Sequence, residues 1–377
     1  MKDIPVMVVD GEENVSNERD LDNSASLQTN QEETLDGIQH ERFSALKPRY
    51  STLQDLDKAR EAEGYTNSSV NMRDVADGSA NHIRKGLLFR SSQIISPNDL
   101  KYHMINLVFD LRVPPAPCRM HTHNQMQRLN RWLTRIVVWF RRYFFGKREK
   151  LARTNTLLMV DEYTLYEYPK CIRCTNDSKA IYGVKPLDVY HIDLLPSFVE
   201  YWIFYELPFY IKARVLWMKI KGKNPEHYVA NAVADDTILG FIKLYQIILT
   251  GSKRRIARCF RLFLQYDNLP AIVHCIHGKD RTGLFVMLVY LLCEVPREDI
   301  IKDYSISYTL LREGRENHRL ESLPEPLTTD AVMASSEYVM EAILDYFKDT
   351  YGDVTSYLMA GGMTAEEISI VKSIFSV

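Results

Sequence analysis

The chain has 377 residues, of which 46% are hydrophobic, and a formal net charge of −2. It can therefore bury a large core, and its near-neutral charge excludes a general nucleic-acid binder. Six cysteines without a signal-peptide pattern favour a reducing compartment over a disulfide framework, so we expect a cytoplasmic protein, with a peripheral membrane location still open.

The N-terminal segment is polar and acidic, and we predict a disordered tail over residues 1–45. A single domain should follow over 46–377, interrupted by insertions at about 113–188 and 198–235. Short apolar runs predict strands at Leu87–Phe89, Leu107–Leu111, Val189–Ile192 and Ala271–His274. Helical patterns dominate from Asp236 to Gln265 and from Gly283 onward. This order predicts an α/β fold with a mostly parallel sheet.

Residues 128–150 combine an aromatic, apolar arc with an arginine-rich arc at about 100° per residue. This pattern is typical of an interfacial helix on an anionic membrane. A lid over the active site, or a helix packed on the core with a solvated arginine face, stays open as an alternative. The aromatic stretch Phe198–Met218 is predicted to contribute to the core rather than to a recognition surface.

The most informative motif is His-Cys-Ile-His-Gly-Lys-Asp-Arg-Thr-Gly, residues 274–283. A β-branched run precedes it and a long apolar run follows it, which predicts a strand, a tight loop and a helix N-terminus. Loop N–H groups and the helix dipole then converge on one point, which forms an anion site. We predict phosphate binding by Ile276, His277, Gly278, Lys279, Thr282 and Gly283.

The spacing of Cys275 and Arg281 suits phosphoryl transfer. The loop that binds phosphate also stabilises a thiolate, so Cys275 is the predicted nucleophile, which forms a phosphocysteine that water hydrolyses. The planar guanidinium of Arg281 matches two phosphate oxygens. Thr282 can donate to the leaving thiolate, and His274 is better placed to support the loop than to act as a base. Arg281 and the loop amides supply the positive charge, so we expect no metal and no cofactor.

These residues resemble the active-site loop of the protein tyrosine phosphatase superfamily. The Gly-Lys-Asp-Arg-Thr-Gly core is similar to that of the tyrosine/serine phosphatases, a group that acts on phosphotyrosine, phosphoserine and phosphoinositides. Four further segments follow in the order of that group, namely Asn71–Asp74, Leu88–Ser92, Val108–Arg112 and Tyr351–Leu358. The resemblance implies a phosphatase-like α/β core with a helical insertion, and a phosphorylated lipid or protein as substrate.

The general acid is left open by the sequence, because the superfamily's Trp-Pro-Asp motif is absent. Asp280 in the loop and Asp110 at a strand end are equal candidates, and Asp110 could instead orient Arg112 or Arg281. Lys279 either adds positive charge beside the phosphate or is a surface lysine. Two other functions stay open: a soluble inositol polyphosphate phosphatase and a non-catalytic phosphate-binding module.

Overall fold

Short strands form a five-stranded sheet, and three of these strands are fully buried. The computed structural model describes residues 68–79, 81–112, 187–223 and 225–377. Its strands are β1 (Arg73–Asp74), β2 (Leu88–Ser91), β3 (Leu107–Asp110), β4 (Asp188–His191) and β5 (Ala271–His274).

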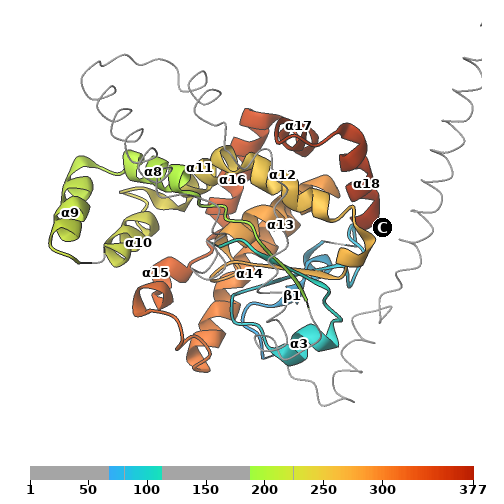
Figure 1. Cartoon of the computed structure of the whole chain (residues 1–377), viewed down its shortest axis with the longest axis horizontal. Helices are drawn as coiled ribbons and strands as arrows, with labels where there is room; N and C mark the ends of the chain where they lie inside the picture. Colours follow the sequence, from blue (N-terminus) through green and yellow to red (C-terminus); the bar gives the residue numbers. More distant parts are fainter. Residues whose placement is uncertain (1–67, 80, 113–186, 224) are drawn as a thin grey trace, which may run out of the picture. The chain divides into compact units, whose positions relative to one another are not determined.

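Helices account for most of the remaining described residues (Figure 1). Those before β5 are η1 (Val75–Gly78), α3 (Pro97–Tyr102), α8 (Ser197–Glu206), α9 (Phe209–Ile220), α10 (Glu226–Ala234), α11 (Gly240–Gly251), α12 (Lys253–Leu262) and η4 (Tyr266–Asn268). Those after β5 are α13 (Asp280–Leu292), α14 (Arg297–Glu316), η5 (Glu325–Thr328), α15 (Asp330–Met333), α16 (Glu337–Tyr351), α17 (Val354–Ala360) and α18 (Ala365–Phe375).

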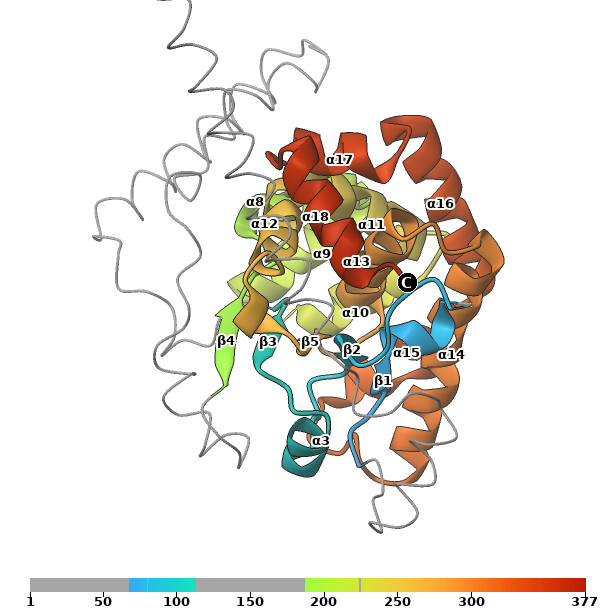
Figure 2. The ribbon, with the colours of Figure 1, turned by 90° about the vertical axis from the view of Figure 1, so that its right-hand side faces the viewer.

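The sheet has the strand order β1-β2-β5-β3-β4, with β1 antiparallel to β2 and the other neighbours parallel (Figure 2). The predicted α/β class and mostly parallel sheet are confirmed, and the four predicted strands are present with end shifts of a residue or two. β1 was not predicted, because a two-residue strand carries no periodic signal. β5 lies in the middle, so the loop that follows it opens at the carboxyl edge of the sheet, where such sheets bind ligands.

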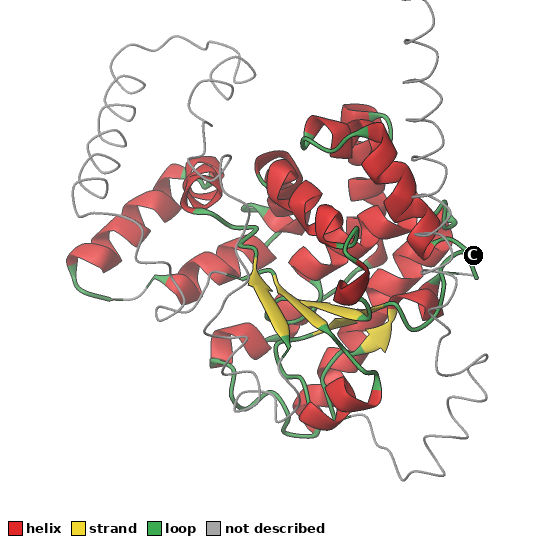
Figure 3. Cartoon of the chain, turned by 45° about the vertical axis from the view of Figure 1, so that its right-hand side comes forward, coloured by secondary structure: helices red, strands yellow, loops and turns green. Residues whose placement is uncertain are grey.

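Successive residues of the central strands point to opposite faces, and each face has its own core. Val108 and Ile272 pack with α3 and β4 residues on one face. Phe109 lies on the other face, where its ring centroid is 5.3 Å from that of Phe263 and 6.2 Å from that of Phe285. Figure 3 shows helices on both sides of the strands. The full burial of β3 and β5 explains their continuous apolar runs.

Helices α8, α9 and α10 form a helical insertion between β4 and α11. The prediction that the Phe198–Met218 aromatics are core is wrong for those with exposed side chains, which are Tyr201, Tyr205, Phe209, Tyr210 and Trp217. The predicted tail over 1–45 and the predicted helix over 128–150 lie outside the described residues. Among the described helices, none combines the length and apolar composition that a membrane crossing requires.

The aromatic cluster of Phe109, Phe260, Phe263, Phe285 and Phe375 should contribute strongly to stability, because all five side chains are fully buried. We expect Phe285→Ala to lower the free energy of unfolding by about 3–5 kcal/mol through lost burial and an unfilled cavity. Urea unfolding followed by circular dichroism measures this change. The half-exposed Met359 is the control, since Met359→Ala should alter stability by less than about 0.5 kcal/mol.

Candidate active site

The loop between β5 and α13 brings the predicted nucleophile to the carboxyl edge of the sheet. Cys275 follows the last strand residue directly and is buried. Backbone N–H groups from Ile276 to Thr282 donate no hydrogen bond to any residue that the structure describes. The first N–H of this region with a backbone partner belongs to Gly283, which donates to the Lys279 carbonyl at 2.8 Å. A run of unpaired amides at a helix N-terminus is an anion-binding site.

The orientation of these N–H groups follows from hydrogen bonds that hold three carbonyl groups of the loop. Each carbonyl of residues 276–278 accepts a hydrogen bond from the side of β1 and β2. The donors are Gln93 N to Ile276 O at 2.9 Å, Asn71 Nδ2 to His277 O at 2.8 Å, and Arg90 Nη2 to Gly278 O at 2.7 Å. Because the carbonyls are held on that side, the intervening N–H groups are left unpaired for an anion.

Gly278 is required by both conformation and space. Its φ is +69°, a left-handed value that residues with a Cβ rarely adopt. A Cβ at this position would lie 2.1 Å from the Ser91 carbonyl oxygen and 2.7 Å from Ser92 N. The loop therefore packs its backbone directly on the end of β2, which only glycine permits.

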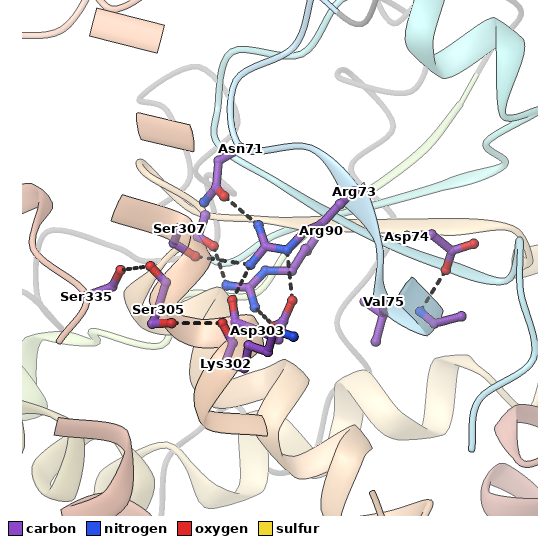
Figure 4. A network of polar contacts seen from close by, with 12 residues as sticks. Asn71, Arg73, Asp74, Val75, Arg90, Lys302, Asp303, Ser305, Ser307 and Ser335 are labelled. Carbon is purple, nitrogen blue, oxygen red and sulfur yellow. Dashed lines mark hydrogen bonds and ion pairs between the residues drawn. The ribbon is translucent and has the colours of Figure 1, made fainter. Parts of the chain in front are cut away.

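A buried charge network supports the loop from behind (Figure 4). Asp303 of α14 forms ion pairs with Arg90 and with Arg73, whose Nε lies 2.8 Å from Asp303 Oδ1. Arg73 also donates to Asn71 Oδ1 at 2.5 Å, which orients the amide that binds the His277 carbonyl. Burial alone would raise the pKa of Asp303, but the two guanidinium groups lower it, so this carboxylate stays ionised.

Two other predicted site residues, Arg281 and Thr282, lie at the start of α13. Arg281 is partly exposed, and its Nη1 donates to the Leu111 carbonyl at 3.3 Å, which places the guanidinium between the loop and the end of β3. Thr282 is fully buried, and its hydroxyl makes no hydrogen bond to the described residues. This hydroxyl is therefore available to donate to a leaving thiolate.

Asp110, one of the two predicted acids, is held as a carboxylate. Its oxygens accept from Arg112 Nε at 2.7 Å and Arg112 Nη2 at 2.8 Å, and His191 Nδ1 lies 3.2 Å away. Burial would raise the pKa of Asp110, but His274, Arg112 and His191 together lower it well below the ordinary value. An acid must hold its proton near neutral pH, so this environment favours the orienting role over proton donation.

Asp280, the other predicted acid, is also stabilised in its charged form. Tyr245 donates a hydroxyl hydrogen bond to Asp280 Oδ1 at 2.6 Å, and Lys279 Nζ lies 3.1 Å from the same oxygen. Burial acts to raise the pKa of Asp280, but Lys279, His277 and the Tyr245 bond lower it overall. Proton donation from this residue would require these contacts to change.

Lys279 is fully buried, so the surface-lysine interpretation is wrong. Its ammonium donates to the Val332 and Ala334 carbonyls at 2.9 and 2.6 Å, and lies 3.9 Å from the ring centroid of Phe241. Burial lowers the pKa of Lys279, and Asp280 opposes this effect. The side chain joins the loop to α15.

His277 of the loop and His274 at the end of β5 are neutral near physiological pH, because burial lowers both pKa values. Burial lowers the pKa of His277 to about 4, and its Nε2 lies 2.8 Å from the Leu327 carbonyl, a contact that joins the loop to η5. His274 is buried with its Nδ1 3.3 Å from the Cys275 carbonyl, and burial lowers its pKa as well. Both rings thus contact backbone carbonyls, which fits support of the loop.

A third carboxylate, Asp193, was missed by the sequence reasoning. It follows β4 and is half-buried, with Oδ1 accepting from Leu195 N at 2.8 Å. The next residue, Leu194, donates to the Leu111 carbonyl that also accepts from Arg281. Burial raises the pKa of Asp193, Arg255 and Arg281 oppose that effect, and Asp110 adds to it. No sequence motif marks this position, because the insertion before β4 separates it from the other site residues.

The support network was also only partly visible in the sequence. Asn71, Arg73 and Arg90 belong to the segments behind the family resemblance, but their spacing alone assigned them no contact with the loop. Asp303 lies on a charged helix and had no distinguishing signal, since helices commonly carry aspartates on solvated faces.

Comparison with known proteins finds a family model and a relative that match this chain. A model of the tyrosine phosphatase family matches residues 65–376, which is most of the chain. The triple specificity protein phosphatase PtpB of Mycobacterium tuberculosis is 25% identical over 138 residues. That alignment covers 33% of this chain and 49% of PtpB, so the chain spans about half the length of this relative.

The Gly278 contact gives a test of the loop geometry. We expect Gly278→Ala to lower turnover of p-nitrophenyl phosphate about 100-fold, because a shift of the loop misplaces the amides and Cys275 together. Gly222→Ala is a matched control, since Gly222 has the same φ of +69° but no atom lies within 4 Å of the place that its new methyl group would take. Similar turnover in the two variants would show that the close approach to Ser91 does not control the site.

Proposed function

We propose that this chain, which belongs to the tyrosine phosphatase family, hydrolyses phosphate monoesters through a phosphocysteine intermediate at Cys275. The observation that carries the proposal is the run of unpaired N–H groups from Ile276 to Thr282 around a buried cysteine. Such amides bind the non-bridging phosphate oxygens and stabilise a thiolate beside them. Arg281 provides the bidentate cation that completes the phosphate site.

In the first step, Cys275 Sγ attacks phosphorus, the S–P bond forms and the P–O bond to the leaving group breaks. The leaving oxygen needs a proton, and we assign its donation to Asp193, because Asp193 is near Arg281 and is the site carboxylate with a raised pKa. In the second step, a water molecule attacks phosphorus, and Asp193 accepts a proton from this water. The S–P bond breaks, inorganic phosphate leaves, and Thr282 donates to the thiolate.

Asp110 and Asp280 have positioning roles in this proposal. Asp110 orients Arg112 and lies beside His191, and Asp280 anchors the start of α13 to Tyr245 and Lys279. Ionised carboxylates beside a phosphate site repel the substrate unless cations neutralise them, and each of these two has a cation as an immediate partner.

We propose two classes of substrate, of which the protein acts on one or both. One class is phosphoinositides, and the other is proteins that carry phosphotyrosine or phosphoserine. The description of PtpB as a triple specificity protein phosphatase supports a range wider than phosphotyrosine. Lys279 does not define this range, because its ammonium is bonded to backbone carbonyls of the chain.

Cys275→Ser should abolish phosphate release from every substrate of a panel that contains phosphotyrosine and phosphoserine peptides, short-chain phosphoinositides and inositol hexakisphosphate. Serine keeps the size of the side chain but is not ionised at neutral pH. Cys293→Ser is the control, since Cys293 is also buried but follows α13 at its far end. A preference for inositol hexakisphosphate would favour the soluble inositol phosphatase, and substrate binding without wild-type turnover would contradict catalysis.

The assignment of Asp193 predicts a dependence on the leaving group. Asp193→Asn should lower turnover of phosphoserine substrates, whose alkoxide needs a proton, by about 100-fold. The effect on p-nitrophenyl phosphate should be much smaller, because its phenolate leaves without protonation. The raised pKa keeps the proton on Asp193 at higher pH. The wild-type rate on phosphoserine should therefore fall as the pH rises through that pKa, and the rate of Asp193→Asn should not show this fall. Equal losses on both substrates would instead assign Asp193 a structural role.

A further inference from the structure

Helix α9 presents an apolar surface that the core does not use. Its inner face is packed on the rest of the protein, since Ile211 and Val215 are buried and the helix contacts α10. On the outer side, Phe209 and Ile220 are 84% and 74% exposed. We define the α9 surface as the exposed apolar residues Phe209, Tyr210, Ala213, Leu216, Trp217 and Ile220. In Figure 1, α9 lies at the edge of the described structure, away from the sheet.

The spacing of these residues makes one continuous arc. At about 100° per residue, they fall within about 120° of the helix circumference. Lys212 falls on one border of this arc and Arg214 on the other. Lys212 Nζ donates to the Tyr205 carbonyl at 2.5 Å, and the Arg214 guanidinium lies over the Tyr228 ring at 5.4 Å. Positive charge on both borders of an apolar arc matches a helix that lies in the plane of a membrane interface.

Charge selects the occupant of this surface. The segment from Leu207 to Pro225 contains no Asp or Glu, and its basic residues are Lys212, Arg214, Lys219, Lys221 and Lys223. The arginine-rich segment 128–150 of the same chain is itself basic, and so is a second copy of α9, so both would be repelled.

We propose that the α9 surface docks this protein on anionic phospholipid bilayers. Phe209, Leu216 and Ile220 enter the acyl boundary, and Lys221 and Lys223, both exposed, contact lipid phosphates. Docking is separate from the phosphatase reaction, since the α9 surface contains none of the residues assigned to the active site. It would supply a membrane-bound phosphate ester to that site at high local concentration.

The test is sedimentation of the full chain, carrying Cys275→Ser to prevent turnover, with phosphatidylcholine vesicles that contain or lack phosphatidylserine. We expect binding to require phosphatidylserine and to weaken about tenfold in Trp217→Ser/Ile220→Ser, because apolar burial in the interface is lost. Lys221→Glu/Lys223→Glu should weaken binding by a similar factor and reduce its sensitivity to salt.

Matched controls lie elsewhere on the surface. Met359→Ser and Lys101→Glu change an exposed apolar residue and an exposed lysine outside α9, and both should bind as the parent does. Equal binding by the α9 variants and the parent would overturn the proposal and assign vesicle binding to another segment, such as 128–150. Absence of vesicle binding by the parent, or loss of a dimer in the α9 variants, would also overturn it.

The outcome is independent of the proposed reaction. With Cys275 intact, the α9 variants should hydrolyse soluble p-nitrophenyl phosphate as the wild type does. Vesicle binding without turnover in any protein would contradict the phosphatase proposal and leave docking supported. Turnover without vesicle binding would contradict the docking proposal and leave the phosphatase proposal supported.

Discussion

The loop around Cys275 is supported by a buried interaction, the pairing of Asp303 with Arg90 and Arg73. Arg90 uses one arm of its guanidinium for Asp303 and the other for the Gly278 carbonyl, so it transmits the position of α14 to the loop. Loss of one partner from a buried pair costs about 3–5 kcal/mol, because a charge is left without compensation. The network thus holds the loop in a conformation with positive φ at Gly278 and a row of unpaired N–H groups. Without this support, the loop would change its conformation and pair these groups.

Environment separates three aspartates that the sequence presents as the same residue type. Asp110 and Asp280 have cationic or hydroxyl partners that outweigh the effect of burial on their pKa values, so they remain charged. Asp193 has more distant cations and Asp110 as a like-charged neighbour, so burial dominates and its pKa is raised. Carboxylates whose pKa values are driven apart by their surroundings are suited to different roles in one site.

The loop is also tied to the segment that follows α14. Lys279 binds two carbonyls next to α15, and His277 contacts a carbonyl of η5. α10 packs against both α15 and η5, which links the helical insertion to the loop through a short series of contacts. A movement of the insertion would therefore change the surroundings of Lys279 before it reached Cys275.

The residues next to Cys275 were enough to predict the strand, loop and helix around it. These elements are adjacent in the chain, and the apolar runs on either side of the loop define them. The parallel strands were predictable for a similar reason, since full burial on both faces produces continuous β-branched runs. Arg90, Asp303 and Asp193 could not be assigned in this way, since their roles depend on contacts between strands and helices that are far apart in the chain. The exposure of α9 likewise came from tertiary packing, which buries Ile211 and Val215 and leaves the larger apolar residues of the same helix outward. Composition alone does not distinguish the two faces, because both are apolar.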